Sequence, residues 1–349
     1  MEIQSSEKSC KDVALTVLTR THAGYFRIAL SLGWQALLWK ILLKDSRMAF
    51  PLLTILWSFS LSILLLLSLL YLLRCIFFFD MIKDEFSHHV GVNYLFAPWI
   101  SWLLILESAP FVTPSHASFV VLWWVLAVPV VVLDVKIYGQ WFTKGKRFLT
   151  AVANPSSHLS VVGNLVGARA ASKMGWREVS VFLFSLGMVH YLVLFVTLYQ
   201  RFSGGDLLPV VLRPVLFLFF AAPSAASLAW YSISGRFDTG SKMMFFLSLF
   251  LFTSLICRPC LFKKAMRKFN IAWWAYSYPI TILALASTRY AQEVNDGVAH
   301  AIRLFLLALS VLVIFGLLLF TAFHPNLLLD PTPSPTHHPT TFPTYLSAN

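Results

Sequence analysis

Charged and titratable side chains inside the apolar runs are the residues of this sequence that could do chemistry. Arg27 lies about one turn into the first run, Arg169 lies near the end of the fifth, and His190 lies within the sixth. A cation in hydrocarbon is costly unless it is paired, hydrated or extended to the membrane surface. Cations at the mouths of a pore also concentrate anions. We therefore regard Arg27 and Arg169 as anion-attracting candidates, with extension to the interface as the alternative.

Motifs of common enzymes are absent from the sequence. It has no glycine-rich phosphate loop, no His-Glu-x-x-His and no Gly-x-Ser-x-Gly. Cys257 and Cys260 have the spacing of a redox pair, but they follow an apolar run, and no second pair or nearby histidine completes a metal site. His190 makes either a structural hydrogen bond or a proton relay. We therefore expect no enzyme, no cofactor and no metal site.

The composition requires lipid around most of the chain. Of its 349 residues, 58% are hydrophobic and 12% are charged, and the mean hydropathy is +0.73. A soluble domain has about 25% charged residues, so the excess apolar side chains must face hydrocarbon. The net charge of +12 is better explained by membrane topology than by nucleic acid, because the basic residues lie between the apolar runs. These features predict an all-α membrane protein with no nucleic-acid partner.

Ten runs are long enough for transmembrane helices, which need about 20 mostly apolar residues each. The fifth is the weakest, since His158, Asn164 and Arg169 lie there among small residues, where hydropathy alone could miss it. The ten expected spans are 23–42, 50–73, 91–107, 118–134, 158–174, 178–200, 207–231, 243–257, 271–288 and 299–322.

The distribution of Lys and Arg predicts the orientation. Most of them fall in segments on the same side as the N-terminus, above all the cluster from Lys263 to Lys268 near two span ends. The positive-inside rule therefore places both termini in the cytoplasm. We expect three parts: a short cytoplasmic segment 1–22, a transmembrane domain 23–322 and a Pro- and Thr-rich, disordered cytoplasmic tail 323–349.

The spans are of two kinds. Even-numbered spans are rich in Leu, Phe and Val, as lipid-facing helices are, whereas most odd-numbered spans contain Gly, Ala, Ser and Pro. Backbone groups freed by kinks are tolerated in lipid only where protein or water satisfies them. We therefore predict five helical hairpins, each with one inner and one outer helix, around a central pore; the alternative is that small residues only allow tight packing. The expected pore kinks are Pro98, Pro223 and Pro279, and the expected pore-lining polar residues are Ser160, Asn164, Ser224 and Ser227.

Several stretches resemble the plant slow-type anion channels, relatives of bacterial tellurite-resistance and dicarboxylate-transporter proteins. The likeness runs from about residue 20 to residue 322. It implies ten helices in five hairpins around a pore, homotrimers with one pore in each subunit, and passive conduction of chloride or nitrate across the plasma membrane, with a protein kinase as regulator. The stretches that carry it are Lys136–Trp141, Val152–Asn164, His190-Tyr191 with Phe195–Arg201, Ala221–Ser227 and Ala272–Tyr276.

The likeness also points to a gate. Family members have a phenylalanine plug within Trp-Trp-x-Tyr-Thr-Phe-Pro, and here Tyr278 takes its place, immediately before Pro279. Tyr278 is eight residues beyond Asn270, about 12 Å along a helix, which is near the bilayer midplane. A second pore phenylalanine of the family aligns with Leu104. An aromatic plug closes a narrow pore by filling and dewetting it, so Tyr278 and Leu104 are the expected gate residues.

The function expected from these features is passive conduction of chloride and nitrate by a slow-type anion channel. Two alternatives remain open. The first is an electrically silent subunit that modulates conducting homologues in heteromers. The second is a proton-coupled dicarboxylate (malate) transporter. It needs titratable carboxylates in the inner helices, and none lies well inside them, although His190 of the sixth span could serve. The sequence does not rank chloride against nitrate.

Overall fold

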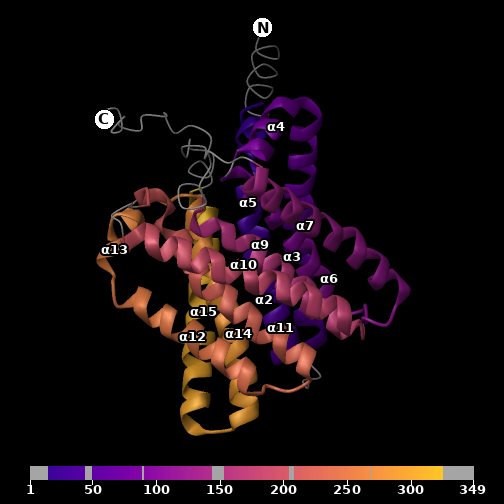
Figure 1. Ribbon diagram of the computed structural model, residues 1–349, viewed down its shortest axis with the longest axis vertical. Coiled ribbons are helices and arrows are strands. Elements are labelled where there is room, and N and C mark those ends of the chain that lie inside the picture. Colours follow the sequence, from indigo (N-terminus) through magenta and orange to yellow (C-terminus); the bar gives the residue numbers. More distant parts are fainter. Residues whose placement is uncertain are drawn as a thin grey trace.

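The computed structural model describes residues 15–43, 49–88, 90–143, 153–203, 208–267 and 269–324, and every regular element in these ranges is helical. Most of the expected segment 1–22 and tail 323–349 lies outside them. The long helices form one bundle, with α4 (Phe79–Ser87) at one end and the α14–α15 turn at the other (Figure 1). The helices of 13 or more residues in the described ranges are α2 (Phe26–Leu42), α3 (Ala49–Phe77), α6 (Phe96–Ser108), α7 (Ala117–Thr143), α9 (His158–Lys173), α10 (Arg177–Ser203), α11 (Leu218–Ser234), α12 (Thr239–Ile256), α14 (Ser277–Val294) and α15 (Gly297–Phe323).

Burial divides these helices into two classes. Helices α3, α7, α10, α12 and α15 present large apolar side chains outward; Ile55 of α3 and Leu312 of α15, for example, are 68% and 70% exposed. Helices α2, α6, α9, α11 and α14 are buried over most of their length. Apolar surface on this scale requires hydrocarbon around it. The difference in sequence between odd and even spans therefore matches a difference in burial.

The five buried helices pack against one another in a closed ring. Helix α2 packs against α6, α6 against α9, α9 against α11, α11 against α14, and α14 against α2. Each ring helix also packs against the exposed helix that follows it in the chain: α3, α7, α10, α12 and α15, in that order. The exposed helices therefore lie outside the ring.

Length and hydropathy identify fewer membrane spans than the ten expected. Six helical segments of the described chain pass both criteria, and a seventh passes if α4 and the bent stretch of α5 (Gly91–Tyr94) and α6 count as one span. Helices α2 and α9 are only 17 and 16 residues long, and α14 includes Ser, Thr, Arg and Gln. Protein rather than lipid surrounds these ring helices, so their sequences need not be uniformly apolar. The six segments are Phe50–Phe77, Ala117–Gly139, Arg177–Phe202, Leu212–Ser234, Thr239–Ile256 and Gly297–Phe323.

Short helical turns precede the ring helices and fix where they start. Three of the 3-10 helices among them begin at a capping side chain: η1 (Ala23–Tyr25) before α2, η2 (Pro155–Ser157) before α9, and η5 (Ile271–Tyr276) before α14. Each is capped by a side chain that accepts a hydrogen bond from the backbone two residues on, which satisfies an otherwise free N–H group. The bonds are Gly24 N to His22 Nδ1 (3.0 Å), Ser156 N to Asn154 Oδ1 (2.8 Å) and Ala272 N to Asn270 Oδ1 (2.9 Å).

The contact between α2 and α6 depends on a glycine. A Cβ atom placed on Gly33 would lie 3.1 Å from Cβ of Leu104, closer than side chains normally pack. We expect Gly33→Val to separate the two helices and to cost about 1–3 kcal/mol, as overpacking typically does, which thermal unfolding in detergent would detect. The control is Gly316→Val on α15, where no atom lies within 4 Å of an added Cβ. Equal melting temperatures for the two variants would contradict this account.

Candidate functional site

The expected gate residue Tyr278 lies at the start of α14, inside the ring of helices. It is fully buried, and its hydroxyl makes no hydrogen bond within the described residues. The charged or ionisable side chains that act on it electrostatically are Arg27 and Tyr94. Tyr278 and Arg27 are the second residues of α14 and α2, two helices that pack together. The structure thus brings together two residues singled out for different reasons, and adds Tyr94.

Arg27 is a buried cation without a carboxylate partner. Only 3% of it is exposed, and its guanidinium carbon lies 4.4 Å from the centre of the Tyr94 ring, a cation–π contact. Within the described chain it makes no hydrogen bond and no ion pair, whereas Arg74 lies 3.8 Å from Glu85. Loss of hydration, reinforced by Arg27 and then Arg74, lowers the pKa of the nearby His22 to about 3. No carboxylate of the described residues therefore lies within ion-pair distance of Arg27.

Leu104 and the three prolines lie at helix contacts and helix starts. Leu104 is fully buried where α6 meets Gly33 of α2. Pro98 and Pro279 are each the third residue of their helices, α6 and α14, where a missing N–H group interrupts no intrahelical bond. Pro223 lies inside α11, where it does interrupt the bonding. Only Pro223 therefore has the interior position expected of a kink; the other two mark helix starts.

The four expected pore-lining polar residues direct their side chains at outer helices. Ser160 and Asn164 of α9 donate to the two carboxylate oxygens of Asp134 on α7, at 2.5 and 2.6 Å. The Ser160 hydroxyl also lies 3.0 Å from Nδ1 of His190 on α10. Ser224 hydrogen-bonds the Ser248 hydroxyl, and Ser227 donates to the Ser241 carbonyl at 2.8 Å, both on α12. Because these atoms bond to neighbouring helices, we do not carry the four residues into the proposed pore lining.

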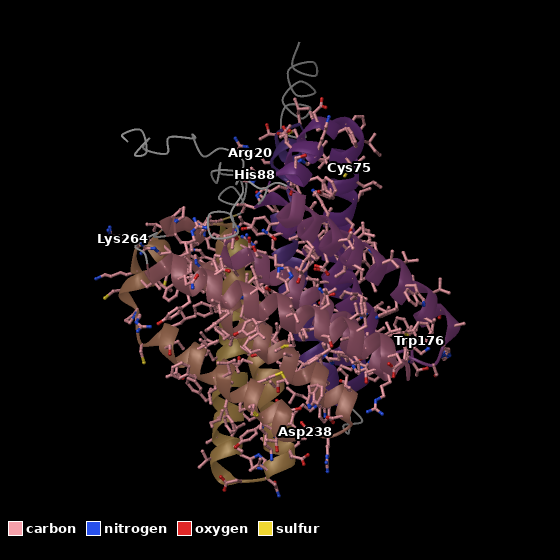
Figure 2. The ribbon with its side chains drawn as sticks, in the orientation of Figure 1. Arg20, Cys75, His88, Trp176, Asp238 and Lys264 are labelled. Atoms are coloured by element: carbon pink, nitrogen blue, oxygen red, sulfur yellow. The ribbon has the colours of Figure 1, made fainter. Side chains whose placement is uncertain are left out.

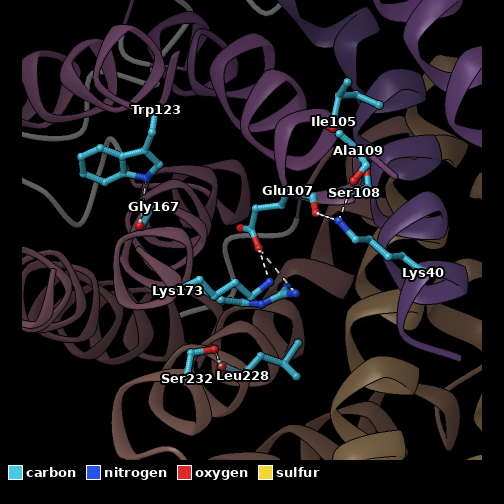
Figure 3. Close-up of polar contacts among 11 residues, drawn as sticks. Lys40, Ile105, Glu107, Ser108, Ala109, Trp123, Gly167, Lys173, Leu228 and Ser232 are labelled. Carbon is cyan, nitrogen blue, oxygen red and sulfur yellow. Dashed lines mark hydrogen bonds and ion pairs between the residues drawn. The ribbon is translucent and has the colours of Figure 1, made fainter. Parts of the chain in front are cut away.

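Arg169, the other anion-attracting candidate, is paired with a buried carboxylate. The Glu107 carboxylate at the end of α6 accepts from Lys173 Nζ at 2.8 Å (Figure 3). The same carboxylate lies 3.5 Å from Arg169 Nη2. Lys40 Nζ donates to the carbonyls of Glu107 and Ala109, at 2.9 and 2.7 Å. Among the described residues, the C-terminal ends of α2, α6 and α9 thus hold three cations around one carboxylate. These four groups carry a net positive charge, but Arg169 is paired.

Comparison with known proteins shows the family. Residues 20–322 match the model of a family described as voltage-dependent anion channel, named SLAC1. The chain belongs to this family. It is a multi-pass membrane protein, and the matched region contains the whole helical bundle.

Proteins similar to this family member are known in Arabidopsis thaliana. The S-type anion channel SLAH1 is 55% identical over 92% of this chain and 86% of its own length. The S-type anion channel SLAH4 is 57% identical over 91% of this chain and 87% of its own length. The guard cell S-type anion channel SLAC1 is 44% identical over 88% of this chain and 56% of its own length. The function carried by the family is thus that of an anion channel rather than an enzyme.

Two features of this channel-family protein escaped the sequence analysis. The pairing of Glu107 with Arg169 had a usable signal, because Glu107 is the last residue of the expected span 91–107 and Arg169 lies near the end of the expected span 158–174. Tyr94 had none, because it precedes α6 in the short helix α5 and no pattern linked it to Arg27.

The buried network around Asp134 should contribute to stability. Asp134→Ala would leave the donors of Ser160 and Asn164 without their acceptor, and an unsatisfied buried polar group costs about 1–3 kcal/mol. We therefore expect a melting temperature in detergent several degrees below wild type. Asp84→Ala in the exposed part of α4 is the matched control. A fall no larger than that of the control would show that the network is not stabilising.

Proposed function

We propose that this protein is a slow-type anion channel that conducts chloride and nitrate passively across the plasma membrane. The observation that carries the proposal is the family match over residues 20–322. The named relatives, described as S-type anion channels, support it. The buried, uncompensated Arg27 also suits a path for anions, because a fixed positive charge attracts them and repels cations.

In this proposal all ten long helices cross the membrane as five hairpins, and the pore follows the axis of the ring formed by α2, α6, α9, α11 and α14. The channel domain is 23–322, and the segments 1–22 and 323–349 lie in the cytoplasm. The placement of connecting residues supports this topology. Figure 2 shows Arg20, Cys75, His88 and Lys264 toward the upper end of the molecule, and Trp176 and Asp238 toward the lower end. Alternate connections therefore lie at opposite ends.

Tyr278 is the proposed gate, at the point where α14 meets α2. Its ring occupies the interior of the bundle with no exposed surface, and an aromatic side chain in a narrow pore excludes water and ions. The exposed apolar faces of the outer helices would also allow the chain to assemble as the expected homotrimer, or as a heteromer with homologous channels. A protein kinase remains the expected regulator.

Voltage clamp of oocytes expressing the protein tests the proposal. We expect a current whose reversal potential follows the chloride and nitrate gradients and is unaffected by cation replacement. Surface biotinylation confirms that the protein reaches the plasma membrane. A surface-expressed protein without anion current, both alone and with Tyr278→Ala, would refute conduction by this chain alone. Current only on co-expression with a homologue would instead favour the silent subunit.

The proton-coupled dicarboxylate transporter has one observation in its favour. The buried Asp134 carboxylate is linked through Ser160 to His190, which places two titratable groups within the bundle. Such chains can relay protons in transporters. Reconstituted vesicles with an imposed pH gradient separate the two functions: malate accumulates against its gradient in a coupled carrier, whereas a channel only dissipates anion gradients.

A further inference from the structure

We propose that Arg27, Tyr94 and Tyr278 form a binding site for one small monovalent anion, beside the gate. The inference rests on the proposed function, because it names the site in the pathway where the conducted anion is held. Three elements build the site: α2 supplies Arg27, α5 supplies Tyr94 and α14 supplies Tyr278.

Charge balance is the first argument. Burying a cation without a counter-charge is strongly unfavourable, and Arg74 and Arg169, the other buried arginines considered above, each face a glutamate. Arg27 faces the Tyr94 ring, which compensates only part of the charge. The neighbouring His22 is neutral, because its pKa is about 3. Glu85, which accepts from the Ala23 backbone at the start of this segment, is paired with Arg74. A mobile anion would supply the negative charge that Arg27 lacks.

Hydrogen bonding points to the same ligand. A guanidinium carries five N–H donors and no acceptor, and Arg27 uses none of them within the described chain. The Tyr278 hydroxyl, on the helix that packs against α2, is also buried without a partner in the described part of the structure. Buried donors without an acceptor on two packed helices suit a ligand that only accepts hydrogen bonds, such as chloride or nitrate.

The helix ends add to this attraction. Arg27 and Tyr278 lie in the first turns of α2 and α14, which are 17 and 18 residues long. The N-terminus of an α-helix carries a partial positive charge that stabilises anions nearby. The positive ends of two packed helices therefore lie at the turns that carry Arg27 and Tyr278.

The shape of the guanidinium predicts which anion is held more tightly. A planar fork of N–H groups can donate two parallel hydrogen bonds to a planar oxyanion, and lysine cannot reproduce this geometry. Nitrate should therefore bind more tightly than chloride. Arg27→Lys should keep anion binding but reduce the preference for nitrate, whereas Arg27→Gln should abolish binding.

The first test measures binding without requiring current. The full-length protein in detergent is heated in sodium nitrate, sodium chloride or sodium gluconate at constant ionic strength. A ligand that binds the folded state raises the melting temperature, and at equal concentration the tighter ligand raises it more. We therefore expect melting temperatures that fall in the order nitrate, chloride, gluconate in wild type, and equal values in Arg27→Gln. The exposed Arg236→Gln in the α11–α12 connection is the matched loss of one charge, and it should retain the wild-type order.

The outcomes separate the site from the function. If Arg27→Gln keeps the full nitrate effect, the inference fails, whatever the currents are. If wild type shows the effect, Arg27→Gln loses it and no variant conducts, the site stands and conduction by this chain alone fails. If Arg27→Gln does not fold, Arg27→Lys is used instead. A difference in melting temperature between nitrate and chloride equal to that of wild type overturns the assignment, and a smaller difference supports it.

Discussion

Replacing Tyr278 with alanine raises the resting anion current several-fold in oocytes, and replacing it with phenylalanine lowers the current. The structural reason is the complete burial of the Tyr278 ring at the junction of α14 and α2. Removing the ring opens volume that water and anions can enter, whereas phenylalanine fills the same volume and removes a hydroxyl that could hydrogen-bond an anion. The reversal potential should continue to follow the anion gradient, because Arg27 remains in place.

The neighbouring Tyr276 provides a control for the phenylalanine variant. Its hydroxyl is likewise buried without a hydrogen-bond partner in the described residues, but its ring packs against Phe217 and Phe262, at 4.8 and 6.0 Å between ring centres. Tyr276→Phe removes the equivalent hydroxyl oxygen from a ring that packs against Phe217 and Phe262, and it should leave the current unchanged. Wild-type current in both Tyr278 variants, at equal surface expression, would remove Tyr278 from the gate.

How far the sequence predicted the fold can be judged from α9 and α3. The uninterrupted apolar run of α3 was identified easily because lipid demands such a composition along the whole helix. Helix α9 is almost wholly buried in protein, so it can contain Ser160, Asn164 and Arg169 and still lie inside the bundle. Length and hydropathy criteria therefore do not identify such a helix as a membrane span. The distribution of Lys and Arg supported its inclusion, because nine spans without it would break the positive-inside pattern.

The site was less predictable, because sequence gives the type of a side chain but not its direction. Ser160 and Asn164 are four residues apart and therefore share a face of α9, but nothing in the sequence says that this face meets Asp134 on α7 rather than a pore. Arg27 and Tyr278 were each recognised, yet their proximity depends on the packing of α2 against α14. That packing joins segments about 250 residues apart in the chain.

The cluster at the opposite ends of the ring helices gives the largest expected loss of stability. Glu107→Gln removes the single carboxylate from a site that holds Arg169, Lys173 and Lys40. Arg169 is only 4% exposed, and leaving a buried ion without its partner costs about 3–5 kcal/mol. Lys173 adds little to this figure, because a third of its side chain is exposed to solvent. We expect a clearly lower melting temperature in detergent and reduced surface expression.

A double-mutant cycle distinguishes the ion pair from a general effect of altering Glu107. Arg169→Gln removes the most buried cation and leaves Glu107 with Lys173 at 2.8 Å, so it should cost less than Glu107→Gln. The double variant Glu107→Gln/Arg169→Gln should be more stable than Glu107→Gln alone, because its buried charges balance better, and the difference measures the coupling. Additive losses would mean that the two side chains do not interact. Glu107 would then stabilise this end of the ring without its pairing to Arg169.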